Sequence, residues 1–105
     1  MILYNVTVSI DTNIHEEWLA WMRSTHIPQV METGCFLESR ISRVNGEEEG
    51  GMTFAITYLS PSAEIFEKYE KEHAPLLQAD HSKRYAGKFA AFRTTLSVIE
   101  EFKNI

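Results

Sequence analysis

The chain of 105 residues contains one cysteine and an excess of acidic over basic residues. Cys35 has no second cysteine with which to form an internal disulfide, which is typical of proteins from reducing compartments. Ten Lys and Arg residues stand against 15 Asp and Glu, a net charge of −5. Binding to nucleic-acid phosphates requires an excess of basic residues on one surface. We therefore expect a cytoplasmic protein that binds no nucleic acid.

Long apolar runs are also missing, and none approaches the roughly 18 residues that a membrane span requires. Residues 1–8 lack a basic segment and alternate apolar with polar positions almost at once, so we expect a strand there and no signal peptide. A chain of this length is too short for two separate cores. We expect one domain over residues 1–105 that does not associate with membranes.

Four segments alternate apolar and polar residues with the period of a half-buried strand. The clearest is 2–10, and the others are 35–44, 52–59 and 89–99. Residues 45–51 separate the second and third segments and combine glycines with three glutamates, which indicates a solvated hairpin loop.

Two further segments have the period of amphipathic helices. The first begins near Asn13 and buries Ile14, Trp18 and Trp21 or Met22, at a spacing of i, i+4 and i+7 or i+8. Pro28 has no amide hydrogen and disfavours helical geometry at the residue before it, so we expect this helix to end near His26. A short turn should follow as far as Gly34.

The second helical segment starts with Pro61 at its first helical position and ends around residues 81–85. We expect Pro75 to interrupt it. Its His73-x-Pro75 motif lies 47 residues after His26-x-Pro28, which indicates a weak internal repeat.

The resulting order, β-α-β-β-α-β, predicts an α+β domain of the ferredoxin-like plan, with a four-stranded antiparallel sheet and two helices on one face. Alternation assigns an apolar set of side chains to the helix-covered face: Val6, Val8, Ile10, Leu37, Ile41, Phe54, Ile56, Phe92, Leu96 and Val98. Cys35 is also placed there, as a small buried apolar residue.

The opposite face receives Leu3, Asn5, Thr7, Ser9, Phe36, Glu38, Arg40, Thr53, Thr57, Arg93, Thr95 and Ser97. Small β-branched polar residues with few charges suit a surface that packs sheet against sheet. We therefore expect a homodimer through this face, and a monomer with one hydrated face is the alternative.

This strand and helix order resembles the dimeric α+β barrel superfamily, in which two ferredoxin-like protomers join their sheets. The motif Trp18-x7-His26-Ile-Pro, followed by Thr33-Gly-Cys-Phe, resembles a family of small uncharacterised bacterial proteins, domains of unknown function. The resemblance covers nearly the whole chain and implies a dimeric barrel, whereas a shared fold does not fix a function.

The superfamily also includes antibiotic-biosynthesis-type monooxygenases and haem-degrading enzymes. The haem-degrading members use an asparagine on the first strand with a tryptophan and a histidine on the second helix. Asn5 and His81 match the first and last of these positions, but both tryptophans of this chain lie on the first helix. We expect no cofactor.

His26 and His73 each precede a proline by two residues. Such a pair near a cleft is suited to acid–base work or ligand contact. Alternatively, each imidazole satisfies backbone groups that the proline frees. The four histidines show no i, i+4 pair, so we expect no metal site.

Three functional hypotheses follow. The first is an uncharacterised dimeric barrel protein that binds a small apolar or aromatic ligand between sheet and helices. The second is a monooxygenase-type enzyme of the antibiotic-biosynthesis or haem-degrading kind, and the third is a structural or regulatory interaction module without a ligand. The expected pocket is lined by Asn5, Trp18, Trp21, His26, Arg40, Tyr69 and His73.

Overall fold

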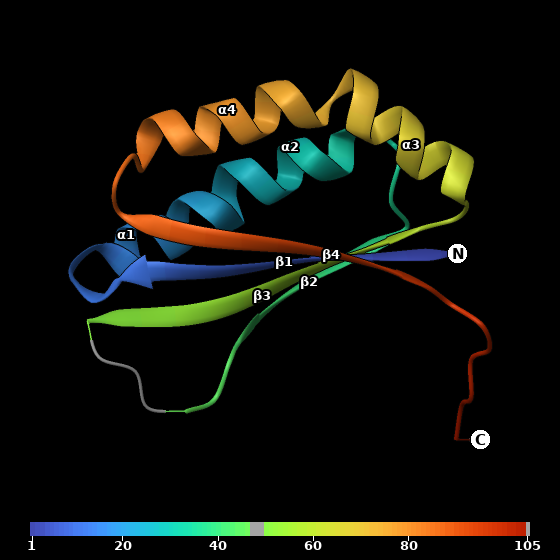
Figure 1. The fold of residues 1–105 in the computed structure, drawn as a ribbon, viewed down its shortest axis with the longest axis horizontal. Coiled ribbons are helices and arrows are strands. Elements are labelled where there is room, and N and C mark those ends of the chain that lie inside the picture. The colour runs from blue at the N-terminus through green and yellow to red at the C-terminus, as the bar shows by residue number, and fades with distance from the viewer. Residues whose placement is uncertain (47–49, 105) are drawn as a thin grey trace.

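A computed structural model describes residues 1–46 and 50–104, so the glutamates at 47–49 of the predicted loop lie outside the described residues. It shows one four-stranded antiparallel sheet in the order β2-β3-β1-β4 (Figure 1). Its strands are β1 (Ile2–Asp11), β2 (Glu38–Arg43), β3 (Gly51–Ser60) and β4 (Phe89–Ser97).

Both helical layers lie on one side of this sheet (Figure 1). The first layer contains a 3-10 turn (Thr12–Ile14), α1 (His15–Trp21), a π-helical turn (Met22–His26) and α2 (Ile27–Glu32). The second contains α3 (Ala63–Glu72) and α4 (Ala74–Arg84). The α+β, ferredoxin-like architecture is therefore confirmed, and no helix in the described part of the chain is both long and apolar enough to cross a membrane.

The predicted end of the first helix near His26 was wrong. His26 and Ile27 both keep right-handed helical angles, with φ of −68° and −63°, and the chain continues into α2. The Ile27 N–H donates to the carbonyl of Met22, five residues back, which is the hydrogen bond of a π-helix. The wider turn moves carbonyl groups away from the Pro28 ring, so the helical path continues past the proline.

The second helical layer accommodates its proline by a break. His73 leaves helical geometry, with φ of −122°, and α4 begins again at Ala74 with Pro75 in its first turn, where a missing N–H does no harm. The predicted interruption is confirmed. The start of the layer was wrong by two residues, since Ser62 caps α3 by accepting the N–H of Ile65 and the helix begins at Ala63.

The predicted alternation of β4 was wrong by one residue. Arg93 pairs with Val6 and therefore lies on the helix-covered face, and so do Thr95 and Ser97, two and four residues later. Phe92 pairs with Thr7 and lies on the open face. The ring of Phe89 packs edge-on against His81 at 4.5 Å, which fixes this phase. Phe92 is 71% exposed and Leu96 is 46% exposed, so neither belongs to the core, and Val98 lies beyond the end of the strand.

A second correction concerns the residues before β2. The strand begins at Glu38 and not at Cys35, and Phe36 is buried under the helices, with its ring 4.7 Å from that of Tyr69. Leu37 is 62% exposed in place of the predicted burial. Cys35 is buried, as predicted, among the apolar residues of the core.

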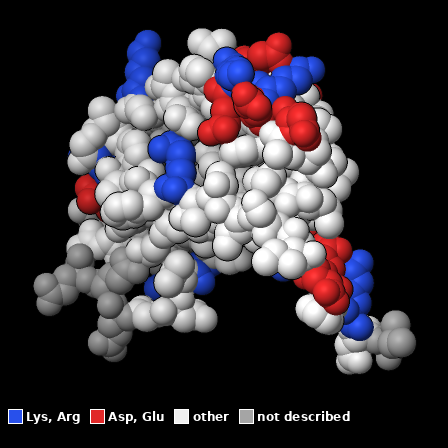
Figure 2. Space-filling model, turned by 45° about the vertical axis from the view of Figure 1, so that its right-hand side comes forward, with Lys and Arg blue, Asp and Glu red and all other residues white. Residues whose placement is uncertain are grey.

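Charged side chains are unevenly spread over the surface. Figure 2 shows acidic and basic groups gathered over α3 and near the C-terminus, with a largely uncharged area between them. On α3 the pairs Lys71–Glu67 and Lys68–Glu72 are spaced four residues apart, at 2.8 and 3.9 Å. Exposed pairs of this kind contribute little to stability and keep the outer surface soluble.

Candidate functional site

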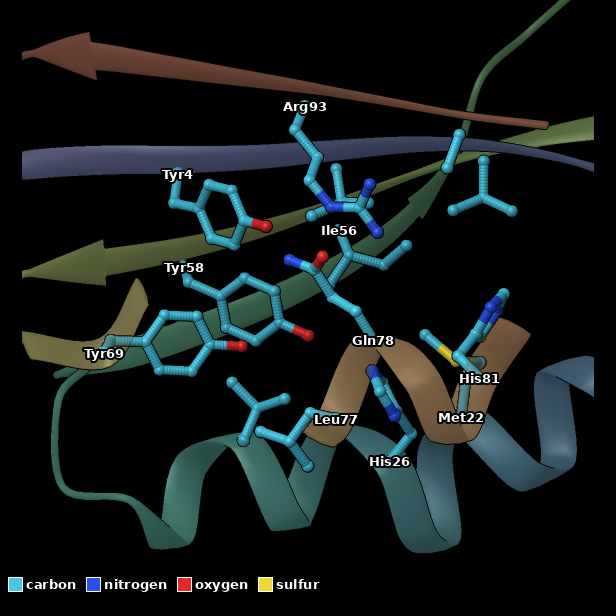
Figure 3. A pocket seen from close by; sticks show the side chains of 14 residues that line it. Tyr4, Met22, His26, Ile56, Tyr58, Tyr69, Leu77, Gln78, His81 and Arg93 are labelled. Carbon is cyan, nitrogen blue, oxygen red and sulfur yellow. The ribbon is translucent and has the colours of Figure 1, made fainter. Parts of the chain in front are cut away.

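A cavity of about 40 Å³ lies between the helices and the sheet (Figure 3). Its apolar wall is formed by aliphatic side chains of the strands and helices, including Val6, Val8 and Ile56. Its polar lining consists of Tyr4, His26, Tyr58, Tyr69, Gln78, His81 and Arg93. Polar groups from α3, α4, β1, β3, β4 and the π-helical turn therefore meet in one space.

His81 is held by the indole of Trp18. The Trp18 Nε1–H donates to His81 Nε2 at 2.9 Å, and Trp18 itself is fully buried. An indole nitrogen only donates, so Nε2 must be unprotonated and the ring proton of the neutral imidazole sits on Nδ1. Burial lowers the pKa of His81 to about 4, and the neighbouring His26 and Arg93 add to this effect.

His26 reaches the same cavity from the π-helical turn. Its ring stacks on Trp21, with centroids 5.1 Å apart and planes at 28°, and lies 5.7 Å from the ring of His81. Burial lowers the pKa of His26, an effect that Asp80 opposes and Arg93 strengthens. Its Nδ1 is buried and finds no hydrogen-bond partner among the described residues.

Three tyrosines line the end of the cavity away from the histidines (Figure 3). Burial raises the pKa of Tyr4, Tyr58 and Tyr69, so their hydroxyl groups stay protonated at neutral pH and can donate. Hydrogen bonding with Arg93 and Gln78 lowers the pKa of Tyr4 and so offsets part of its rise.

An open groove of about 470 Å³ adjoins the cavity. It runs between α4 and β4 and is lined by Tyr4, Glu70, Ala74, Pro75, Gln78, Arg93 and Thr95. Tyr4, Gln78 and Arg93 belong to both hollows. These three side chains therefore form the boundary between the small inner cavity and the larger outer groove.

A family model for domains of unknown function, DUF4286, matches residues 1–99. The chain belongs to the DUF4286 family. This confirms the resemblance to a family of unknown function, and no curated protein sequence matches the chain.

Solved structures show the same fold in more distant proteins. A dimeric ferredoxin-like protein from an uncultured marine organism is 18% identical with a TM-score of 0.71, covering 99% of this chain and 100% of that one. A variant of MhuD with two manganese protoporphyrin IX molecules per active site is 17% identical (TM-score 0.69, 99% and 100% covered). SnoaB, a cofactor-independent oxygenase from Streptomyces nogalater, is 9% identical (TM-score 0.66, 98% of each chain covered).

Haem does not fit the cavity of this DUF4286 protein. The cavity volume of about 40 Å³ is far below the roughly 300–1,000 Å³ of pockets for drug-sized ligands. Neither α3 nor α4 carries a tryptophan, and Asn5 lies outside the cavity. No group of three or more His, Cys, Asp or Glu residues suited to a metal ion occurs among residues 1–46 and 50–104.

The structure brings together four of the seven residues predicted for the pocket. His26 and Tyr69 line the cavity. Trp18 and Trp21 stand behind it, because Trp18 bonds to His81 and Trp21 stacks on His26.

The other three predicted residues lie elsewhere. Asn5 and Arg40 both pair with Thr57 and so share the open face of the sheet, where Asn5 Nδ2 donates to Thr7 Oγ1. His73 lies at the break between α3 and α4, with its ring 6.3 Å from that of Tyr69, and does not line the cavity.

Sequence reasoning missed Tyr4, Tyr58, Gln78 and Arg93, and it reached His81 only through the resemblance. Tyr4 and Tyr58 occupy inward positions among mostly apolar residues of β1 and β3, and such hydroxyl groups on a core face are a usable signal. Arg93 was placed on the wrong face because the alternation of β4 was read one residue out of phase.

Proposed function

We propose that this protein is a cytoplasmic homodimer that binds a small organic ligand at the boundary between the inner cavity and the outer groove. The observation that carries the proposal is that several polar side chains line this boundary and that one buried polar atom among them has no partner in the described part of the chain. That atom is His26 Nδ1.

Buried polar atoms in native proteins nearly always have a hydrogen-bond partner, so an unpaired one marks a place where water or a ligand completes the network. The inner cavity has room for a few water molecules, each of which needs roughly 10–15 Å³. The groove beyond Tyr4, Gln78 and Arg93 has room for a larger molecule. A ligand that reaches inward from the groove would replace these waters.

The open face of the sheet supports the homodimer. Leu59, Leu3 and Leu96 form one cross-strand row there, and Ala55, Thr7 and Phe92 form another. Apolar side chains grouped on an open sheet face, with Phe92 and Leu96 exposed, are typical of an interface. A solved ferredoxin-like neighbour is dimeric, which favours a second copy of this chain as the partner. The single buried cysteine supports a reducing, cytoplasmic setting.

Native mass spectrometry of protein purified without refolding tests both parts of the proposal. The expected result is a dimer, with additional mass that disappears when the protein is denatured. The ligand proposal would be overturned by a dimer that binds no compound from a small-molecule library and whose cavity residues show no ligand-induced NMR shifts. The interaction-module hypothesis would then remain.

The dimer interface has its own variant test. Phe92→Asp places a charge in the apolar surface of the open face, and we expect it to convert the dimer to a monomer in light-scattering measurements of mass. Leu76→Asp is the matched control, because Leu76 is 79% exposed on α4, on the helical side. A Phe92→Asp protein that stays dimeric would place the interface elsewhere.

A further inference from the structure

We propose that the ligand is a small monoanion, an aromatic carboxylate, whose charged head binds Arg93 and whose ring lies in the outer groove. This inference rests on the proposed function and names the chemical class of the ligand. It is carried by the charge and hydrogen-bonding character of the groups around the boundary.

Arg93 is a cation without a protein counter-ion. It extends from β4 toward Gln78 and over the cavity (Figure 3), and no carboxylate of the described residues lies within ion-pair distance of its guanidinium. The exposed side chain of Arg93 interacts with the neutral hydroxyl group of Tyr4, which also interacts with Gln78. A guanidinium binds a carboxylate through two parallel N–H···O bonds, so an anionic head fits here better than a neutral one.

The groups deeper in the cavity mostly offer hydrogens. His81 presents its Nδ1–H, because Trp18 occupies Nε2. The protonated hydroxyl groups of Tyr58 and Tyr69 add two donors. A site with more donors than acceptors favours an anion, which only accepts.

The acidic groups nearby limit the ligand to a single charge. Glu70 lines the outer groove, and Asp80 acts on His26 from α4. Neither of them forms an ion pair with Arg93. Their field opposes a dianion more strongly than a monoanion, which disfavours inorganic phosphate and favours a carboxylate.

The sizes of the two hollows orient the ligand. An aromatic ring does not enter about 40 Å³, since an engineered cavity that binds benzene measures about 150 Å³. A carboxylate head is small enough to replace waters at the boundary. The ring therefore stays in the groove of about 470 Å³, between Pro75 on α4 and Thr95 on β4.

Benzoate and its neutral counterpart benzamide test this inference in the intact protein. Dissociation constants come from NMR titration, followed by the side-chain amide of Gln78 and the ring signals of His81. We expect benzoate to bind about tenfold or more tightly than benzamide. Arg93→Met should bring this ratio close to one, and Arg43→Met, which changes an exposed arginine at the end of β2, should leave it unchanged.

Each other outcome is decisive. Equal binding of the two probes would overturn the anion and leave a neutral ligand at the same site, so the proposed function would survive. A benzoate preference that persists in Arg93→Met would overturn the role of Arg93. Binding of neither probe at about 10 mM would overturn the aromatic carboxylate, whereas native mass spectrometry decides the proposed function separately.

Discussion

His26-x-Pro28 and His73-x-Pro75 are the same short motif at equivalent places in the two halves of the fold, yet they form different structures. Around Pro28 the chain widens into a π-helical turn and stays helical, and around Pro75 it breaks and starts a new helix. The first solution carries His26 into the cavity, stacked on Trp21. The second leaves His73 outside the cavity lining.

The difference shows that a proline motif requires the helix to change its geometry at that point but does not determine which change occurs. A proline inside a helix removes one hydrogen bond and clashes with a carbonyl one turn earlier. The chain avoids the clash either by widening the turn or by ending the helix, and the tertiary packing decides between them. In the first half, two tryptophans anchor the turn under the sheet. The second half has Ile65 and Lys68 at the corresponding offset of 47 residues.

The largest expected difference between the halves is in stability. Trp18→Ala removes a fully buried ring and should lower the free energy of unfolding by about 3–5 kcal/mol. Ile65→Ala, at the equivalent place on α3, removes a partly buried side chain and should lower it by about 1–2 kcal/mol. Urea denaturation measures both, and equal losses would contradict the asymmetry.

The next effect is on the protonation of His81. With a pKa of about 4 in the folded state and about 6.5 in the unfolded state, neutral His81 contributes stability that is fully present above pH 6.5. This contribution is lost as the pH falls toward 4, because the unfolded chain binds the proton first. Trp18→Phe keeps an aromatic ring but frees Nε2, so NMR titration should show a rise in the pKa of His81, which burial still holds below its ordinary value. An unchanged pKa would mean that the indole does not hold the neutral form.

The smallest effects should come from the prolines themselves. Pro28→Ala restores a backbone N–H and a strong helix former within a continuous helical path, and should raise the free energy of unfolding by about 1 kcal/mol. Pro75→Ala, in the first turn of α4, should lower it by about 0.5 kcal/mol by loosening the unfolded chain. Thermal denaturation of the two variants side by side measures the signs, and like signs would show that the two prolines play the same structural part.

The sequence predicted the architecture well because its strongest signals are local. Alternation over residues 2–10 and 52–59 predicted the strands β1 and β3. The break at Pro75 and the glycine that ends α2, Gly34 with φ of 76°, follow from backbone sterics alone. None of these features depends on a distant contact.

The site was predicted less completely because it depends on contacts between distant residues. The hydrogen bond from Trp18 to His81 joins residues 63 positions apart, and no residue spacing in the sequence predicts it. Both alternating sets of β4 contain apolar residues, so the set with Phe92 and Leu96 looked like the core set. Apolar side chains on the open face have the same sequence pattern as core residues, so the alternation within one chain does not distinguish the two faces.

The hydrogen bond from Trp18 to His81 also sets the order in which the cavity takes up protons. As the solution becomes acidic, His81 cannot accept a proton at Nε2 without giving up the indole, whereas the buried Nδ1 of His26 is free of protein partners within the described residues. The first added charge therefore falls on His26, where the face of Trp21 stabilises a cation. That charge joins Arg93 beside the cavity, so we expect mild acid to strengthen binding of the proposed anion until the anion itself is neutralised.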